Sequence, residues 1–66
     1  MRRFELDHGD GRVAVARRPG ELLTLLLRAG ATLGDAQRTL QQLHDGFRSA
    51  NVPVREGLYV RVYSLP

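Results

Sequence analysis

Apolar and polar residues alternate strictly over residues 58–63, near the end of the chain. Because strand side chains alternate between two faces, the aliphatic residues of this segment share one face, and they are Leu58, Val60 and Val62. The opposite face carries Tyr59, Arg61 and Tyr63. The pattern predicts a strand that buries its aliphatic face and presents two phenols around a guanidinium, a surface suited to stacking and hydrogen bonding.

The first seventeen residues favour a hairpin. Apolar positions alternate with other residues over 3–7 and again over 12–17. Between them lies Gly9-Asp10-Gly11, and glycine reaches the positive φ angles of tight turns at no steric cost. We expect two antiparallel strands joined by a turn over residues 7–11.

A leucine-rich helix is predicted over residues 19–29. Pro19 suits the first helical position, where its missing N–H is not needed, and Gly30 suits a left-handed cap. The polar positions form one narrow stripe of Glu21, Thr24 and Arg28. A helix this apolar is expected to be largely enclosed by its own fold or by a partner.

A second helix is predicted to begin after Thr32, whose hydroxyl would accept from first-turn amides while Asp35 reaches back in a capping box. Asn51 and Pro53 are expected to end it, and residues 52–55 to form a short extended arm before a turn at Glu56-Gly57. The apolar spacing is 3-4-3-4-3, a single seam, made by Leu33, Ala36, Leu40, Leu43, Phe47 and Ala50.

These elements predict one α+β domain over residues 1–66, with the order β-β-α-α-β. The expected architecture is a three-stranded antiparallel sheet with a two-helix layer on one face. A chain of 66 residues buries only about 60% of its unfolded surface, so its stability margin is small.

Composition narrows the class of protein. The chain has no cysteine, which excludes disulfides and thiolate sites, and its net charge of +3 comes with ten arginines and no lysine. Arginine suits phosphate and carboxylate partners, although a GC-rich genome produces the same usage. The apolar run 22–27 is too short to span a membrane. The first residues lack an apolar signal core, so we expect a cytoplasmic protein with no membrane partner.

Catalytic chemistry is not predicted. Asp7-His8-Gly9-Asp10 places an imidazole between two carboxylates, but such residues also make ordinary turns. His44 beside Asp45 lies on the polar face of the second helix. With no nucleophile triad, phosphate loop or metal-ligand spacing, the sequence predicts no catalytic residue, no metal site and no cofactor.

A binding role is the main hypothesis. Tyrosine and arginine are enriched at interface hot spots, and we expect the Tyr59, Arg61 and Tyr63 face to dock on a protein partner. The expected neighbours on that face are Arg3, Arg12 and Glu5. A phage or mobile-element inhibitor of a host complex would have this build. A homodimer through the open sheet face or a sheet edge is a further interpretation.

Nucleic acid is the alternative partner. The same sheet face, through Arg61, could stack bases and meet phosphates. The helix pair around residues 28–32 also has helix-turn-helix rhythm, with Arg28 before the turn and Arg38 near the front of the second helix. The second helix, however, carries Gln, Asp and Thr as often as Arg, whereas DNA-binding surfaces usually have denser positive charge.

Three stretches carry a family resemblance: Val13–Glu21, Leu25–Gly30 and Val54–Val62. Together, residues 13–62 resemble the LysM-like module found ahead of the peptidase domain in some bacterial cell-wall metallopeptidases. That family has a Gly-Asp-Thr-Leu helix start and a Pro-Gly-Gln turn, where this chain has Gly20-Glu21-Leu22-Leu23 and Glu56-Gly57-Leu58. The resemblance implies a β-α-α-β core and, for true LysM modules, binding of glycans that contain N-acetylglucosamine. It implies no particular binding residue here.

Overall fold

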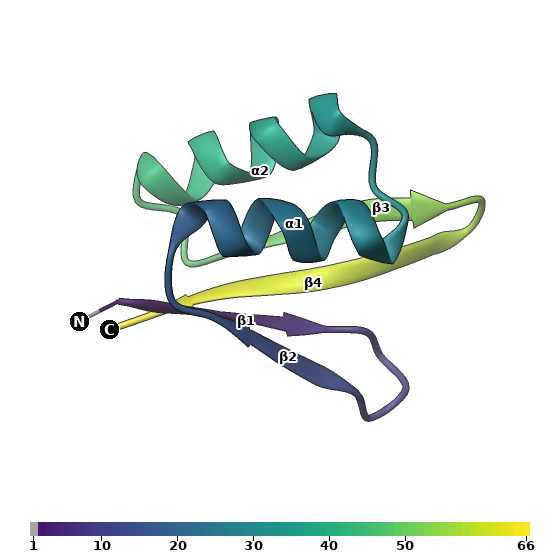
Figure 1. Ribbon diagram of the computed structural model, residues 1–66, viewed down its shortest axis with the longest axis horizontal. Helices are drawn as coiled ribbons and strands as arrows, with labels where there is room; N and C mark the ends of the chain where they lie inside the picture. Colours follow the sequence, from purple (N-terminus) through teal and green to yellow (C-terminus); the bar gives the residue numbers. More distant parts are fainter. Residues whose placement is uncertain (1) are drawn as a thin grey trace.

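The computed structural model describes residues 2–66 as two hairpins separated by a pair of helices (Figure 1). The elements are β1 (Arg3–Asp7), β2 (Val13–Ala16), α1 (Pro19–Ala29), α2 (Leu33–His44), β3 (Ser49–Arg55) and β4 (Leu58–Leu65). All strand pairs are antiparallel, in the order β2-β1-β4-β3. The first and last strands of the chain are therefore neighbours at the centre of the sheet, and both helices lie on one side of it.

The prediction of a three-stranded sheet is wrong, although the α+β class is correct, because the sheet has four strands. The second helix does not reach Ala50 but ends at His44, and residues 49–55 form β3. Gly46 adopts a φ of 105°, which stops the helix and turns the chain back toward the sheet. Phe47 belongs to no helical seam and is 56% exposed.

The helix starts follow the local sequence signals. Pro19 opens α1, and Gly30 closes it in the left-handed conformation. At the start of α2 the backbone N–H of Asp35 donates to Thr32 Oγ1 at 3.1 Å, as the predicted cap requires. The Asp35 carboxylate accepts from Arg38 Nη1 at 3.1 Å instead of completing the capping box.

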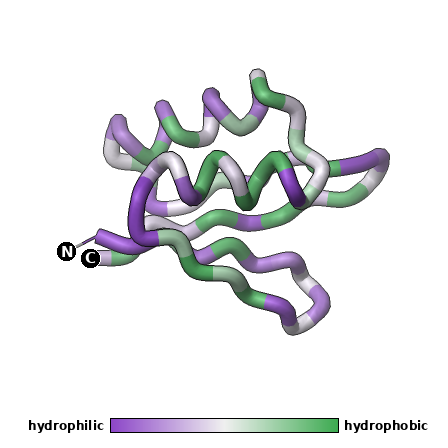
Figure 2. The backbone as a smooth tube through the Cα atoms, in the orientation of Figure 1, coloured by the Kyte–Doolittle hydropathy of each residue, from purple (hydrophilic) through white to green (hydrophobic). Residues whose placement is uncertain are grey.

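The core lies between the helices and one face of the sheet. Hydrophobic and hydrophilic residues alternate along the strands in Figure 2, and the buried hydrophobic residues of the strands pack with those of the helices in one core. Burying apolar surface is the main favourable contribution to folding. The largest side chains buried in this layer are Leu6, Leu22, Leu26, Leu43, Val52 and Val62.

Gly30 fixes the end of α1 against β3. A Cβ atom at this position would lie 2.7 Å from the backbone oxygen of Val54, which is too close for any side chain. Its φ of 110° is also one that residues with a side chain rarely adopt. Both the short distance and the positive φ therefore require glycine at position 30. This close contact brings the end of α1 against β3 near the β3–β4 turn.

Within residues 2–66, neither helix has the length and apolar character that crossing a membrane would require.

Candidate functional site

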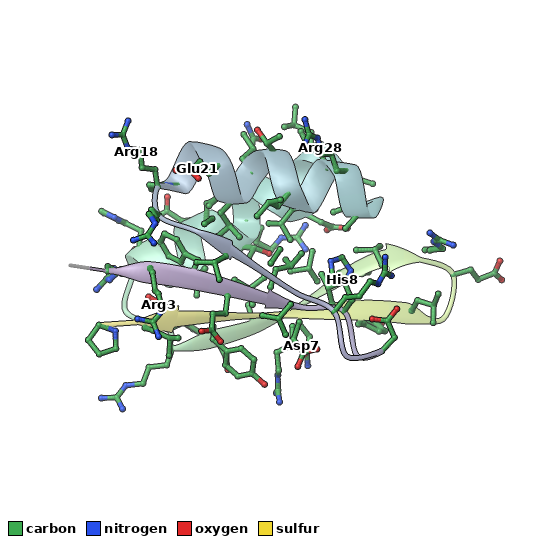
Figure 3. The ribbon with its side chains drawn as sticks, turned by 60° about the horizontal axis from the view of Figure 1, so that its bottom comes forward. Arg3, Asp7, His8, Arg18, Glu21 and Arg28 are labelled. Atoms are coloured by element: carbon green, nitrogen blue, oxygen red, sulfur yellow. The ribbon has the colours of Figure 1, made fainter. Side chains whose placement is uncertain are left out.

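The face of the sheet opposite the helices is uncovered by any element in residues 2–66 (Figure 3). Arg3 and Asp7 point away from the helices on this side. Side-chain alternation and the strand registers define the open face, as we call it, as Arg3, Glu5, Asp7, Val13, Val15, Ser49, Asn51, Pro53, Tyr59, Arg61, Tyr63 and Leu65.

The register brings acidic and basic residues of the open face side by side. Asp7 is opposite Arg61 across the central strand pair, and Glu5 is opposite Tyr63. Directly opposite residues on one face of an antiparallel pair have Cβ atoms about 5 Å apart, close enough for their side chains to interact. The center of the open face is thus a mixed row of carboxylates, guanidinium and phenol.

Two contacts order the side chains at this centre. Arg3 Nε lies 3.7 Å from Glu5 Oε2, and the Arg61 guanidinium carbon lies 5.9 Å from the centre of the Tyr63 ring. The second distance fits a cation–π contact. Exposed ion pairs contribute little to stability, so these charges leave the open face polar and accessible without holding the fold together.

Most of the predicted partner-binding residues come together. Tyr59, Arg61 and Tyr63 lie in a row on β4, beside Arg3 and Glu5 on β1. Tyr59 is 62% exposed, whereas Tyr63 is half-buried between its neighbours. The open face therefore offers one phenol that is largely exposed to solvent and one that is partly covered by its neighbours.

Arg12 is the exception, because it does not lie on the open face. It precedes β2, and its Nε donates to Asp10 Oδ2 at 2.8 Å inside the β1–β2 turn. The structure turns β2 so that Ala14 and Ala16 face α1, and Ala16 is fully buried. Arg12 follows the same alternation, which puts it on the helix side of the sheet.

The three arginines of the nucleic-acid hypothesis do not share a surface. Arg28 lies in the last turn of α1, and Arg38 lies on α2, paired with Asp35. Arg61 is on the open face, which lies on the other side of the sheet from both helices. No single duplex or strand could contact all three from one side.

The carboxylates of the Asp7–Gly11 segment make hydrogen bonds within the β1–β2 turn. Asp7 Oδ1 accepts from the Gly9 N–H at 2.8 Å, and Asp10 Oδ1 accepts from the Arg12 N–H at 3.1 Å. The hydrogen bond from the Arg12 backbone, with smaller help from its side chain, lowers the pKa of Asp10 below 3.8. Within residues 2–66 no three His, Asp or Glu side chains gather as metal ligands.

The sequence analysis does not predict several members of the open face, among them Asp7, Val13, Val15, Asn51 and Pro53. A place for Arg12 on the open face implies that Val13 and Val15 face the helices, whereas the structure turns the smaller Ala14 and Ala16 toward α1. Asn51 and Pro53 are expected to end the second helix, whereas the structure places both in β3. The alternation of Ala50, Val52 and Val54 with polar residues was the signal that could have revealed β3.

The fold and the open face define a two-layer α+β protein with one bare sheet surface. The chain matches no protein-family model, and no curated protein and no solved structure is significantly similar to it.

Proposed function

We propose that this chain is a non-enzymatic binding protein that docks on a protein partner through the open face. The observation that carries the proposal is the uncovered sheet surface, on which Tyr59 is 62% and Val13 is 55% exposed. Tyrosine supplies a large contact area at low entropic cost, and both tyrosine and arginine are enriched at interface hot spots.

The charge of the open face favours protein over nucleic acid. Arg3 and Arg61 are balanced there by Glu5 and Asp7, so the surface as a whole is neutral. Affinity for nucleic acid depends on positive charges that displace counterions from phosphates. A neutral surface of phenols, valines and paired charges is instead typical of a protein interface.

The edges of the sheet are poorer docking sites than its open face. β2 has only four residues, and β3 carries Pro53, which lacks the N–H that an added strand would need. A homodimer, if this chain forms one, is therefore expected through the open face. There, each copy offers acidic β1 residues to the other's Arg61.

Site-specific photo-crosslinking tests the proposal. A photo-reactive residue placed at Asn51, on the open face, is expected to capture a protein in cells of the source organism, whereas one at Gln37, exposed on α2, is not. Capture at Asn51 should be lost when Tyr59, Arg61 and Tyr63 are all changed to alanine. It should persist when the exposed α2 residues Gln37, Arg38 and Gln41 are changed.

The captured species decides among partners. A host protein would support the proposal, and a product of twice the chain mass would identify a second copy as the partner. Capture of nucleic acid that disappears on nuclease treatment would favour the alternative hypothesis. Binding to N-acetylglucosamine oligomers in a separate titration would favour the LysM resemblance. Equal capture at Asn51 and Gln37 would contradict docking through the open face.

A further inference from the structure

A pocket lies on the helix side of the sheet, at the end of the molecule away from the termini, where two strand turns and one helix end come together. Figure 1 shows the β1–β2 turn, the β3–β4 turn and the end of α1 at this end. The pocket has a volume of about 530 Å³. Pockets of about 300–1,000 Å³ accommodate small organic ligands. We call it the basic pocket.

The basic pocket gathers positive charge from three separate segments. Arg12 comes from the β1–β2 turn, Arg28 from the last turn of α1 and Arg55 from the end of β3. His8, half-buried on the helix side of the sheet, adds an imidazole to the lining (Figure 3). Asp10 is the only acidic residue of the lining.

Two of these arginines have no partner. Arg12 is held by Asp10 at 2.8 Å, which neutralises both charges. Among residues 2–66, Arg28 and Arg55 make no ion pair within 4.0 Å and donate no side-chain hydrogen bond. Two like charges facing one cavity repel each other, and a bound anion would relieve this repulsion. The guanidinium fork suits phosphate in particular.

Part of the wall of the basic pocket is apolar. Leu6, Leu58 and Val60 line it from the sheet and Leu25 lines it from α1; Leu58, at the start of β4, is 54% exposed. Such side chains suit an uncharged ring or hydrocarbon body next to the anionic group.

We propose that the basic pocket binds a nucleotide-sized organic phosphate, with Arg28 and Arg55 holding the phosphate group. A phosphate monoester carries close to two negative charges at neutral pH, matching the two unpartnered guanidinium groups. The ligand's ring would lie against Leu25 and Leu58. The same chemistry could come from a free nucleotide or from the 5′-phosphate end of a nucleic-acid strand.

The frame of the basic pocket is set before any ligand binds. Gly30 packs its Cα against the backbone oxygen of Val54, leaving no space for a Cβ. This contact holds the helix turn of Arg28 next to the strand end of Arg55. Because the backbone of both segments is already in place, binding has to order only the two arginine side chains.

Titration followed by NMR of backbone amides tests the proposal. Adenosine monophosphate at up to millimolar concentration is expected to shift amides of residues 8–12, 28–30 and 55–59 in a saturable manner. Adenosine and inorganic phosphate, each one half of the ligand, should bind at least about tenfold more weakly. Adenosine lacks the charged hydrogen bonds to the arginines, and inorganic phosphate lacks the contacts with the apolar side chains.

Arginine variants provide the matched comparison. Arg28→Ala and Arg55→Ala should each weaken binding of adenosine monophosphate by about tenfold or more. Arg18→Ala and Arg48→Ala remove the same charge from exposed positions outside the pocket lining and should change affinity by less than about twofold. Arg61→Ala, on the open face, should also leave it unchanged, which separates this site from the docking surface.

Two results would overturn the proposal: no saturable binding of adenosine monophosphate, or equal weakening by the Arg28→Ala and Arg18→Ala variants. A 5′-phosphorylated dinucleotide distinguishes the two sources of phosphate. Binding at least tenfold tighter than the mononucleotide would identify the strand end as the ligand, and weaker binding would identify the free nucleotide.

Discussion

The helix-covered face and the open face of the sheet take alternate residues from the same four strands. On the covered side Leu6, Val52 and Val62 are at most 1% exposed. On the open side Tyr59 and Val13 keep more than half of their surface in water. The two faces differ because the helices supply apolar partners to only one of them. Stability is therefore concentrated on one face, and residues of the other can change at little cost to the fold.

The strongest test of this difference compares alanine substitutions at two adjacent β1 residues that face opposite sides of the sheet. Leu6→Ala should lower the free energy of unfolding by about 2–5 kcal/mol, because it removes a fully buried side chain and leaves a cavity. Glu5→Ala, one residue earlier on the open face, should change it by no more than about 0.5 kcal/mol. Urea unfolding measures both values. Similar losses in the two variants would contradict the division between the faces.

The attachment of the helical layer depends on Gly30. Gly30→Ala should cost about 2 kcal/mol or more, since a left-handed L-residue alone costs about 1–2 kcal/mol and its Cβ would also meet the Val54 oxygen. Gly34→Ala is the matched control, because its Cβ would meet nothing within 4 Å inside α2. It should raise stability by about 0.5 kcal/mol. Thermal unfolding measures both variants, and a change of stability of the same sign in Gly30→Ala and Gly34→Ala would contradict the close approach of Gly30 to Val54.

The cover over the sheet also depends on the start of α2. Thr32→Ala removes the oxygen that accepts from the Asp35 N–H, and should cost about 1 kcal/mol. Thr32→Ser keeps an accepting hydroxyl and should restore most of that loss. Chemical denaturation of the three proteins gives the comparison, and a serine variant as unstable as the alanine variant would argue against capping.

The open face should separate stability from binding. Arg61→Ala removes an exposed charge and should change unfolding free energy by no more than about 0.5 kcal/mol. The same change should weaken capture by a partner at Asn51, because Arg61 lies at the center of the docking surface. Asp7 is the cross-strand neighbour of Arg61. The Asp7→Asn variant tests whether the partner contacts both charges. Unchanged capture in both variants would move the docking site elsewhere.

The smallest expected effect is the pH dependence contributed by Asp10. Its pKa is lowered in the folded protein, chiefly by the hydrogen bond from the Arg12 backbone. The ionised carboxylate therefore stabilises the fold above its ordinary pKa of 3.8, and this small contribution is lost as the pH falls through the lower folded value. Asp10→Asn should show less acid destabilisation than the parent between pH 4 and 2 in otherwise identical melts. A steeper acid loss in the variant would reverse this assignment.

Local signals predicted the parts of the fold that depend on neighbouring residues. Pro19 and Gly30 mark the bounds of α1 as observed, and Thr32 caps α2. The strict alternation of residues 58–63 lies within β4. The same kind of signal failed after His44, because Phe47 and Ala50 continue a helical spacing that the chain does not follow. Gly46 was the break in that pattern, and its backbone conformation outweighed the spacing of apolar residues.

By itself, the sequence determined the α+β class, the first hairpin, the bounds of α1 and the two-sided character of β4, since periodicity and turn residues act over a few neighbours. Only the tertiary structure decided that β3 completes the sheet and that alanines rather than valines of β2 face the helices. It also decided that Arg12, Arg28 and Arg55 meet around one pocket. These outcomes depend on pairing and packing between segments far apart in the chain, where steric fit selects among patterns that are locally equivalent.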